Sequence, residues 1–218
     1  MLQTEVAGQR LLLLAQRAAF RPEPGILLIA DAHVGKAHSF RRLGVPVPAG
    51  ITADMLATLS ALIRSTAAQR LVFLGDLLHS ARSRSPATWA AVADWRQGHA
   101  QVEMTLVRGN HDRHAGDPPP EWRIDAVDEP LRCGPLALAH HPDPVAGAYV
   151  LAGHVHPAAV LGGRAHDRLR LPCFHLGPEV GVLPAFGGFT GMHVLPRGPS
   201  DRVFVIAGDS VRALHSLP

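Results

Sequence analysis

Five short apolar runs, each ending in a motif rich in aspartate or histidine, constrain the fold of this 218-residue chain more than any other feature. The runs are only a few residues long and are bounded by glycine or charge, which is typical of strands buried on both faces. They are Gly25–Ala30, Leu71–Leu74, Val102–Val107, Leu136–Ala139 and Tyr149–Ala152. We therefore expect buried strands that present polar side chains at their carboxyl ends.

Helical patterns separate the first three runs. Ile51–Ile63 is rich in Ala, Leu and Met, has apolar residues at helical spacing, and offers Thr52 as an N-cap. Ser85–Arg96 carries Pro86 at a first-turn position. The order strand, helix, strand, helix, strand predicts a parallel α/β core.

The pattern changes after His156. Three strand-like pieces, separated by Gly and Pro, predict antiparallel strands of a second sheet. They are Leu169–Leu176, Val180–Phe186 and Val203–Val211. The early segment Glu5–Arg21 predicts a hairpin that joins one of the sheets, and Arg113–Trp122, with its Gly and Pro residues, predicts an irregular loop beside the site.

Composition limits the class of protein. At 23.3 kDa the chain fits one domain over residues 1–218. No apolar run approaches the roughly 18 residues of a membrane span, and Leu11–Leu14 is too short for a signal-peptide core, so we expect a soluble, cytoplasmic protein. Cys133 and Cys173 are expected to be reduced. The net charge of +3 favours polyanionic partners only weakly.

The motifs that follow the runs supply mixed nitrogen and oxygen ligands for two adjacent divalent metals. A carboxylate such as Asp76 can bridge two cations, Asn110 offers a neutral amide oxygen, and residues two apart, as in His154-Val155-His156, point the same way in extended chain. The predicted metal ligands are Asp31, His33, Asp76, Asn110, His140, His154 and His156. The fourth position is a doublet, and either His140 or His141 could be the ligand; we favour His140 because it directly continues the apolar strand.

Each motif also has an ordinary structural explanation. Aspartate after a strand is often a turn former, and Gly-Asn-His-Asp alone could be a simple turn. A single histidine at a strand end is more often a surface or hydrogen-bonded residue than a ligand. All of these explanations must hold at once to remove the metal interpretation, so the ordered set predicts a binuclear site.

In these residues the chain resembles the calcineurin-like metallophosphoesterase superfamily, whose signature is D-x-H, GD, GNH[DE], H and GHxH. The resemblance implies an α/β fold with a four-layer α-β-β-α sandwich of two mixed β-sheets. It implies two divalent metal ions, with Mn²⁺ expected and Fe, Zn, Ni or Co as alternatives. One metal would be held by Asp31, His33 and His156, the other by Asn110, His140 and His154, with Asp76 bridging. It also implies that His111 is the catalytic histidine near the substrate phosphate, with Asp112 as its orienting partner.

A narrower resemblance covers nearly the whole chain. The segments FRRLGVPVP (40–48), LVFLGDLLHS (71–80) and LRLPCFHLGP (169–178) are similar to the ligase-associated DNA damage response endonuclease family, PdeM. One departure is Ala32, which stands where Leu is more usual. This resemblance implies DNA as substrate, a link to DNA repair, and association with an ATP-dependent DNA ligase and other repair enzymes.

The resulting hypothesis is a metallophosphoesterase, a phosphodiesterase or endonuclease that hydrolyses phosphodiester bonds in DNA by attack of a metal-bridging hydroxide. His111 would act as acid or oxyanion stabiliser, and His79, Arg113 and Lys36 would bind substrate. Two alternatives stay open: a small-molecule phosphoesterase acting on a cyclic nucleotide or nucleotide, and a mainly scaffolding component of a repair complex. A basic rim for DNA could form from Arg41, Arg42, Arg82, Arg84, Arg113, Arg164, Arg168 and Arg170, or these could be a scattered solvated surface.

Overall fold

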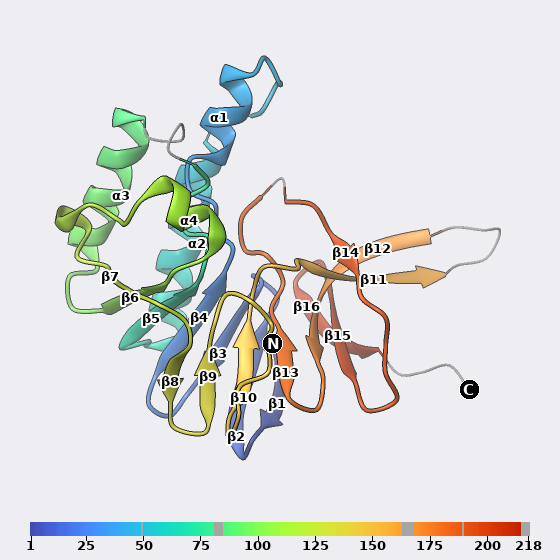
Figure 1. Cartoon of the computed structure of the whole chain (residues 1–218). Helices are drawn as coiled ribbons and strands as arrows, with labels where there is room; N and C mark the ends of the chain where they lie inside the picture. Colours follow the sequence, from blue (N-terminus) through green and yellow to red (C-terminus); the bar gives the residue numbers. More distant parts are fainter. Residues whose placement is uncertain (49, 81–84, 163–167, 189, 215–218) are drawn as a thin grey trace.

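The first of two sheets begins as an antiparallel meander and continues as a parallel sheet (Figure 1). The computed structural model describes residues 1–48, 50–80, 85–162, 168–188 and 190–214. Within these residues the strands of the first sheet are β1 (Leu2–Val6), β2 (Gln9–Leu14), β3 (Ala18–Arg21), β4 (Ile26–Ala30), β5 (Arg70–Leu74), β6 (Glu103–Val107) and β7 (Asp125–Val127), adjacent in that order. β1 to β4 pair antiparallel and β4 to β7 parallel. The expected parallel core and the early hairpin are both confirmed.

The helices follow the expected pattern, with one difference at a cap. They are α1 (Lys36–Arg42), α2 (Ile51–Thr66), α3 (Pro86–Gly98), α4 (Asn110–Ala115) and the 3₁₀ helix η2 (Pro120–Trp122). α3 begins as expected, because the Ser85 hydroxyl accepts a hydrogen bond from the Thr88 N–H at 3.1 Å and Pro86 is its first residue. The prediction of Thr52 as N-cap is wrong: α2 begins after Gly50, whose φ of 89° turns the chain into the helix.

The segment Arg113–Trp122 is also more regular than predicted. It begins inside α4 and ends in η2, so it is not an irregular loop throughout. The reason lies at the start of α4, where the Asp112 carboxylate accepts a hydrogen bond from the Gly109 N–H at 2.9 Å. An acidic side chain that returns to the backbone in this way satisfies a free N–H group and stabilises the first helical turn.

The second sheet is mixed. Its described strands are β8 (Leu131–Cys133), β9 (Leu136–Leu138), β10 (Tyr149–Ala152), β11 (Pro157–Gly162), β12 (Arg168–Leu176), β13 (Val180–Val182), β14 (His193–Val194), β15 (Arg202–Ala207) and β16 (Ser210–Leu214). The expected antiparallel strands are confirmed where β12 pairs with β13 and with β15. The prediction did not include two parallel pairings, of β13 with β10 and of β14 with β11. Parallel neighbours need a long connection, and here β11 and β12 form the connection between β10 and β13.

Two hydrophobic cores hold the layers together. One lies between the first sheet and its helices and includes Leu59, Phe73 and Trp122. The other lies between the two sheets, where Leu74 and Phe174 are fully buried. The α/β class with two mixed sheets is thus confirmed. In the described part of the chain all helices precede β7, and α2, α3, α4 and η2 pack against the first sheet. The outer face of β9 and β10 packs against residues 145 and 148.

The two sheets meet at the edge where β4, β5, β9 and β10 end. The Asp31 N–H donates to the Gly75 carbonyl at 3.3 Å, so pairing of β4 with β5 continues past the strands. A bridge between Ala30 and Ala185 and a hydrogen bond from the Phe186 N–H to the Ala30 carbonyl connect this edge to the chain that follows β13. Backbone bonds thus fix both sheets at the place where the polar motifs emerge. No helix in the described residues is long and apolar enough to cross a membrane.

Candidate metal centre

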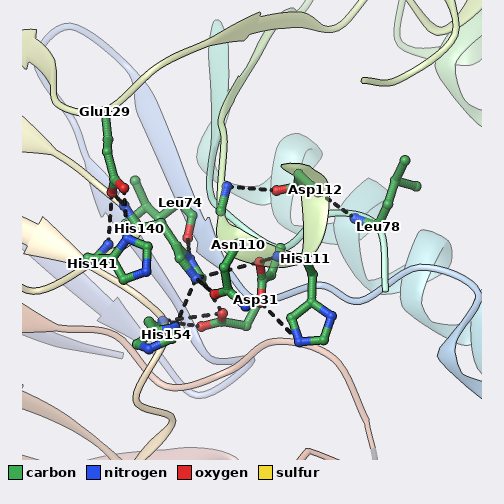
Figure 2. A network of polar contacts seen from close by, with 12 residues as sticks. Asp31, Leu74, Leu78, Asn110, His111, Asp112, Glu129, His140, His141 and His154 are labelled. Atoms are coloured by element: carbon green, nitrogen blue, oxygen red, sulfur yellow. Dashed lines mark hydrogen bonds and ion pairs between the residues drawn. The ribbon is translucent and has the colours of Figure 1, made fainter. Parts of the chain in front are cut away.

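The seven side chains that the motifs predict as ligands converge at this edge from both sheets. Figure 2 shows four of them, Asp31, Asn110, His140 and His154. Asp31 and His33 follow β4, Asp76 follows β5, and Asn110 begins α4 after β6. From the second sheet, His140 follows β9, and His154 and His156 follow β10. Three groups of side chains have ligand atoms within 4.8 Å of one another: Asp31, His33 and His156; His140, His141 and His154; and Asp31, Asp76 and His140.

The group Asp31, His33 and His156, here called the Asp31 half, combines a buried carboxylate with two imidazoles. Nδ1 of His156 donates to the Gly191 carbonyl at 3.1 Å, and Nε2 lies 3.6 Å from the Asp31 carboxylate. Burial, aided by the nearby Lys36 ammonium, lowers the pKa of His33 to about 2. His33 is therefore a neutral imidazole, the form that binds metals. Its Nδ1 is buried without a hydrogen-bond partner.

Asn110, His140 and His154, here called the His140 half, bring one amide oxygen and two ring nitrogens together. Nδ1 of His140 donates to the Leu74 carbonyl at 3.2 Å, which directs Nε2 into the site. This Nε2 lies 2.8 Å from Asn110 Oδ1 and 3.0 Å from His154 Nδ1. His140 is fully buried, whereas the side chain of His141 is 34% exposed. The buried member of the doublet is the one that faces Asn110.

Asp76 lies between the two halves. One carboxylate oxygen is 3.5 Å from His140 Nε2 and accepts the His111 N–H at 2.9 Å. Burial raises the pKa of Asp76, and the neighbouring Asp31 carboxylate adds to the shift. Asp31 and Asp76 are both almost fully buried. Buried carboxylates of this kind need a strong positive charge nearby, and the donor set of carboxylate, amide and imidazole suits divalent cations. The residues present therefore fit a pair of metal ions.

The glycines in these motifs leave room for the donor side chains. A Cβ on Gly75 would overlap the His140 ring, one on Gly109 would overlap the Asp76 carboxylate, and one on Gly153 would lie 2.7 Å from an Asp31 oxygen. Real Cβ atoms do not approach other atoms so closely. The glycines before Asp76, Asn110 and His154 are therefore a steric requirement of the site.

The backbone at most of these donors is left-handed. Nine non-glycine residues of the described chain have positive φ, and five of them are Asp31, His33, Asp76, His154 and His156, with φ from 48° to 69°. This conformation is uncommon for residues with side chains and is found where the surrounding structure enforces it. Here it turns the chain sharply after β4, β5 and β10, so that the side chains face a common centre.

His111 and Asp112 have separate positions. Nδ1 of His111 contacts the His79 carbonyl at 2.7 Å, and Nε2 lies 3.9 Å from the Asp76 carboxylate. The Asp112 carboxylate instead accepts the backbone N–H groups of Leu78 and Gly109, both at 2.9 Å. The role expected for Asp112 thus needs correction, because the His79 carbonyl orients His111 while Asp112 connects the loops after β5 and β6. Figure 2 shows the contact between Asp112 and Leu78.

Comparison with known proteins agrees with this geometry. A family model described as calcineurin-like phosphoesterase matches residues 25–141. The crystal structure of nuclease MPE from Pseudomonas putida is 43% identical, with 98% of this chain and 99% of that chain covered and a TM-score of 0.86. The chain belongs to the calcineurin-like phosphoesterase family. Yfce, a phosphoesterase from E. coli, is 15% identical over 85% of this chain and 95% of that chain, with a TM-score of 0.41. No curated protein sequence matches significantly.

As a calcineurin-like phosphoesterase, the protein is a hydrolase of phosphoester bonds, and its family uses divalent metals. The three residues predicted to bind substrate, Lys36, His79 and Arg113, differ in burial. Lys36 is half-buried at the start of α1, close enough to Asp31 and Asp76 for their charges to act on it, although burial still lowers its pKa. Burial and the nearby Lys36 charge also lower the pKa of His79, to about 4. Arg113 lies exposed on α4.

The phosphoesterase site also contains a residue that sequence reasoning missed. Glu129 lies just before β8, and one of its oxygens accepts the backbone N–H groups of His140 and His141 at 2.8 and 2.9 Å. The other oxygen contacts His141 Nδ1 at 2.7 Å. No motif surrounds Glu129, and it precedes His140 by 11 residues, so only the pairing of β8 with β9 reveals this contact.

Proposed function

We propose that this phosphoesterase is a two-metal phosphodiesterase that cleaves DNA endonucleolytically, with Mn²⁺ as its cation. The observation that carries the proposal is the convergence of two donor groups on the shared carboxylate Asp76. The similarity to a protein named as a nuclease, at 43% identity over nearly the full length, supports a polynucleotide substrate. Sites of this composition and size are suited to phosphodiester chemistry.

In this proposal Asp31, His33 and His156 hold one cation, Asn110, His140 and His154 hold the other, and Asp76 contacts both. Two divalent cations supply a nucleophile at neutral pH and positive charge for the phosphoryl oxygens. The mixture of carboxylate and imidazole donors accommodates Mn²⁺, with Fe, Zn, Ni and Co as alternatives.

His111 serves the leaving group. The contact between its Nδ1 and the His79 carbonyl fixes the ring, so Nε2 faces the side of Asp76. A nitrogen held there can pass a proton to the leaving oxygen or stabilise its negative charge. Lys36 contributes a fixed ammonium beside the two carboxylates, which attracts the phosphate.

Exposed arginines supply the contact with DNA. Arg41 and Arg42 lie in the last turn of α1, Arg113 is on α4, and Arg168 and Arg170 are on β12. In Figure 1, α1 and the β11–β12 hairpin project from different sides of the molecule. The other arginines expected at the rim, Arg82, Arg84 and Arg164, lie outside the described residues.

The narrower resemblance in residues 40–48, 71–80 and 169–178 supports a role in DNA repair. On this basis the enzyme works in the cytoplasm beside an ATP-dependent DNA ligase and other repair enzymes. Arg108, in contrast, is not part of the DNA contact, because its guanidinium pairs with Asp117 at 2.7 Å and Asp128 at 3.3 Å.

The test uses metal-stripped protein reconstituted with Mn²⁺. Circular single-stranded DNA, plasmid DNA and bis-p-nitrophenyl phosphate are incubated with the wild type, with Asp76→Asn, and with the control His99→Ala, which alters a histidine bonded to Ser60 on the helical side. We expect cleavage of DNA and of the aryl diester by the wild type and the control, and neither by Asp76→Asn. DNA left intact while the aryl diester is hydrolysed would refute the nuclease proposal and favour a small-molecule phosphoesterase.

A second measurement separates DNA contact from chemistry. Charge reversal at Arg41 and Arg42 should weaken DNA binding and reduce its salt dependence, because fewer counterions are released on binding. Hydrolysis of the aryl diester should stay unchanged, since this small substrate does not extend to the last turn of α1, where both arginines lie.

A further inference from the structure

Three imidazole rings, not two, form one side of the metal centre. The ring centroids of His140, His141 and His154 are separated by 4.8, 4.8 and 4.7 Å. Each ring offers a nitrogen within 4.8 Å of the nitrogens of the other two. This near-equilateral arrangement gathers three imidazole rings around one volume.

Glu129 holds the third ring in place. Its carboxylate contacts Nδ1 of His141 at 2.7 Å and also accepts the N–H groups of His140 and His141. Nδ1 of His141 is thereby the ring nitrogen that faces Glu129 (Figure 2). The three hydrogen bonds to Glu129 lower its pKa, although burial opposes the shift. The carboxylate accepts all three of these hydrogen bonds.

The second nitrogen of a metal-binding histidine usually donates to a carboxylate or a carbonyl group, which fixes the ring and its tautomer. His140 follows this rule with the Leu74 carbonyl and His156 with the Gly191 carbonyl. His141 follows it with Glu129. By this criterion His141 is held in the same way as His140 and His156.

We propose that His141 is a third imidazole donor to the cation of the His140 half, and that Glu129 is the positioning residue that directs it there. The inference rests on the proposed two-metal site and deepens it. The doublet is then not a choice between two histidines, because the buried His140 and the half-exposed His141 both face the same cation.

A consequence concerns the kind of cation. Imidazole donors suit Zn, Co, Ni and Fe, whereas Mg²⁺ prefers carboxylate and water oxygens. A third imidazole makes the His140 half selective for borderline transition metals. The Asp31 half, which has its own buried carboxylate, is the more tolerant of hard cations.

The test follows Co²⁺ binding to metal-stripped full-length protein by visible absorption and by metal content per chain. The variants are His141→Ala and Glu129→Gln, with His99→Ala and the exposed Glu103→Gln as matched controls. We expect His141→Ala to weaken one of two Co²⁺ sites by about 100-fold and to change its absorption band, and Glu129→Gln to weaken the same site by about tenfold, in the range typical of second-sphere partners.

The outcomes separate the inference from the proposed function. Fewer than two Co²⁺ per wild-type chain would refute the two-metal proposal itself. Two Co²⁺ in the wild type, with unchanged affinity and spectrum in His141→Ala, would overturn only the role of His141. If that variant instead raises KM for the diester without altering Co²⁺ binding, His141 contacts substrate and the inference is wrong. Circular dichroism and thermal unfolding of each variant exclude loss of fold as the cause.

Discussion

The Asp31 half and the His140 half differ in charge and exposure but share a structural origin. The Asp31 half contains a wholly buried carboxylate, whereas the His140 half contains only neutral donors, and its His154 is exposed. Yet each half combines residues of both sheets. In the Asp31 half, His156 follows the second sheet, and in the His140 half, Asn110 follows the first sheet. Each cation would therefore connect the two sheets, and under the proposal above the two halves would differ in which cation they prefer.

The largest expected effect comes from removing one donor from each half. His33→Ala and His140→Ala should each lower hydrolysis of bis-p-nitrophenyl phosphate by about 10⁴-fold, because the two cations act as one unit. For the same reason the double variant should lose little more than either single variant. Kinetics at saturating Mn²⁺ measure this, and losses that multiply in the double variant would show that the halves work independently.

His111 belongs to neither half, so its removal should change the rate of hydrolysis without changing metal binding. His111→Ala should lower turnover by about 10³-fold, in the range of general acid–base catalysis, while both cations stay bound. Metal content per chain, measured beside the rate, decides the point. Loss of one cation in this variant would place His111 among the ligands.

The glycines allow each half to be disturbed without changing a donor. Gly75→Ala places a methyl group into the His140 ring, and Gly153→Ala places one against Asp31. Displacement of a catalytic group by about 1 Å costs about 10² in rate, so each substitution should lower turnover by that factor. Gly134→Ala is the control for Gly75, because its φ is also positive, at +64°, and its Cβ meets open space. Equal losses in control and test would attribute the effect to backbone strain alone.

The smallest effect is thermal. A cation at 100 times its Kd stabilises the fold by about 2.7 kcal/mol, which corresponds to roughly 5–10 °C in Tm for a chain of this size. Chelation should therefore lower Tm, and Mn²⁺ or Co²⁺ should restore it in two steps, one for each half. Mg²⁺ should restore only the step of the Asp31 half. Scanning calorimetry with each cation checks this, and equal recovery with Mg²⁺ would contradict the difference in preference.

The convergence of the predicted ligands could be inferred from the sequence because each lies within four residues of the end of a short buried strand. The parallel order of β4, β5 and β6 follows from the helices between them, and it brings Asp31, Asp76 and Asn110 to one edge. The path of the second sheet is less predictable, since the parallel return of β13 depends on long-range pairing that short apolar runs do not encode.

Local contacts within the centre are the other part that sequence does not predict. Glu129 reaches His141 only because β8 pairs with β9, and Asp112 faces Leu78 because the loops after β5 and β6 lie together. Both contacts join residues far apart in the chain. Motifs identify the residues that carry chemistry, but the partners that orient them depend on tertiary structure.

The left-handed backbone at Asp31, His33, Asp76, His154 and His156 implies a trade-off between folding and turnover. Glycine adopts such φ values at no steric cost, whereas for each other residue this conformation lowers the free energy of unfolding by about 1–3 kcal/mol. Asp76→Gly or His156→Gly should thus make the metal-free protein more resistant to denaturant while abolishing hydrolysis. In a library selected separately for folding and for activity, these positions should rank as tolerant in the first selection and intolerant in the second, which would mark the centre without knowledge of any motif.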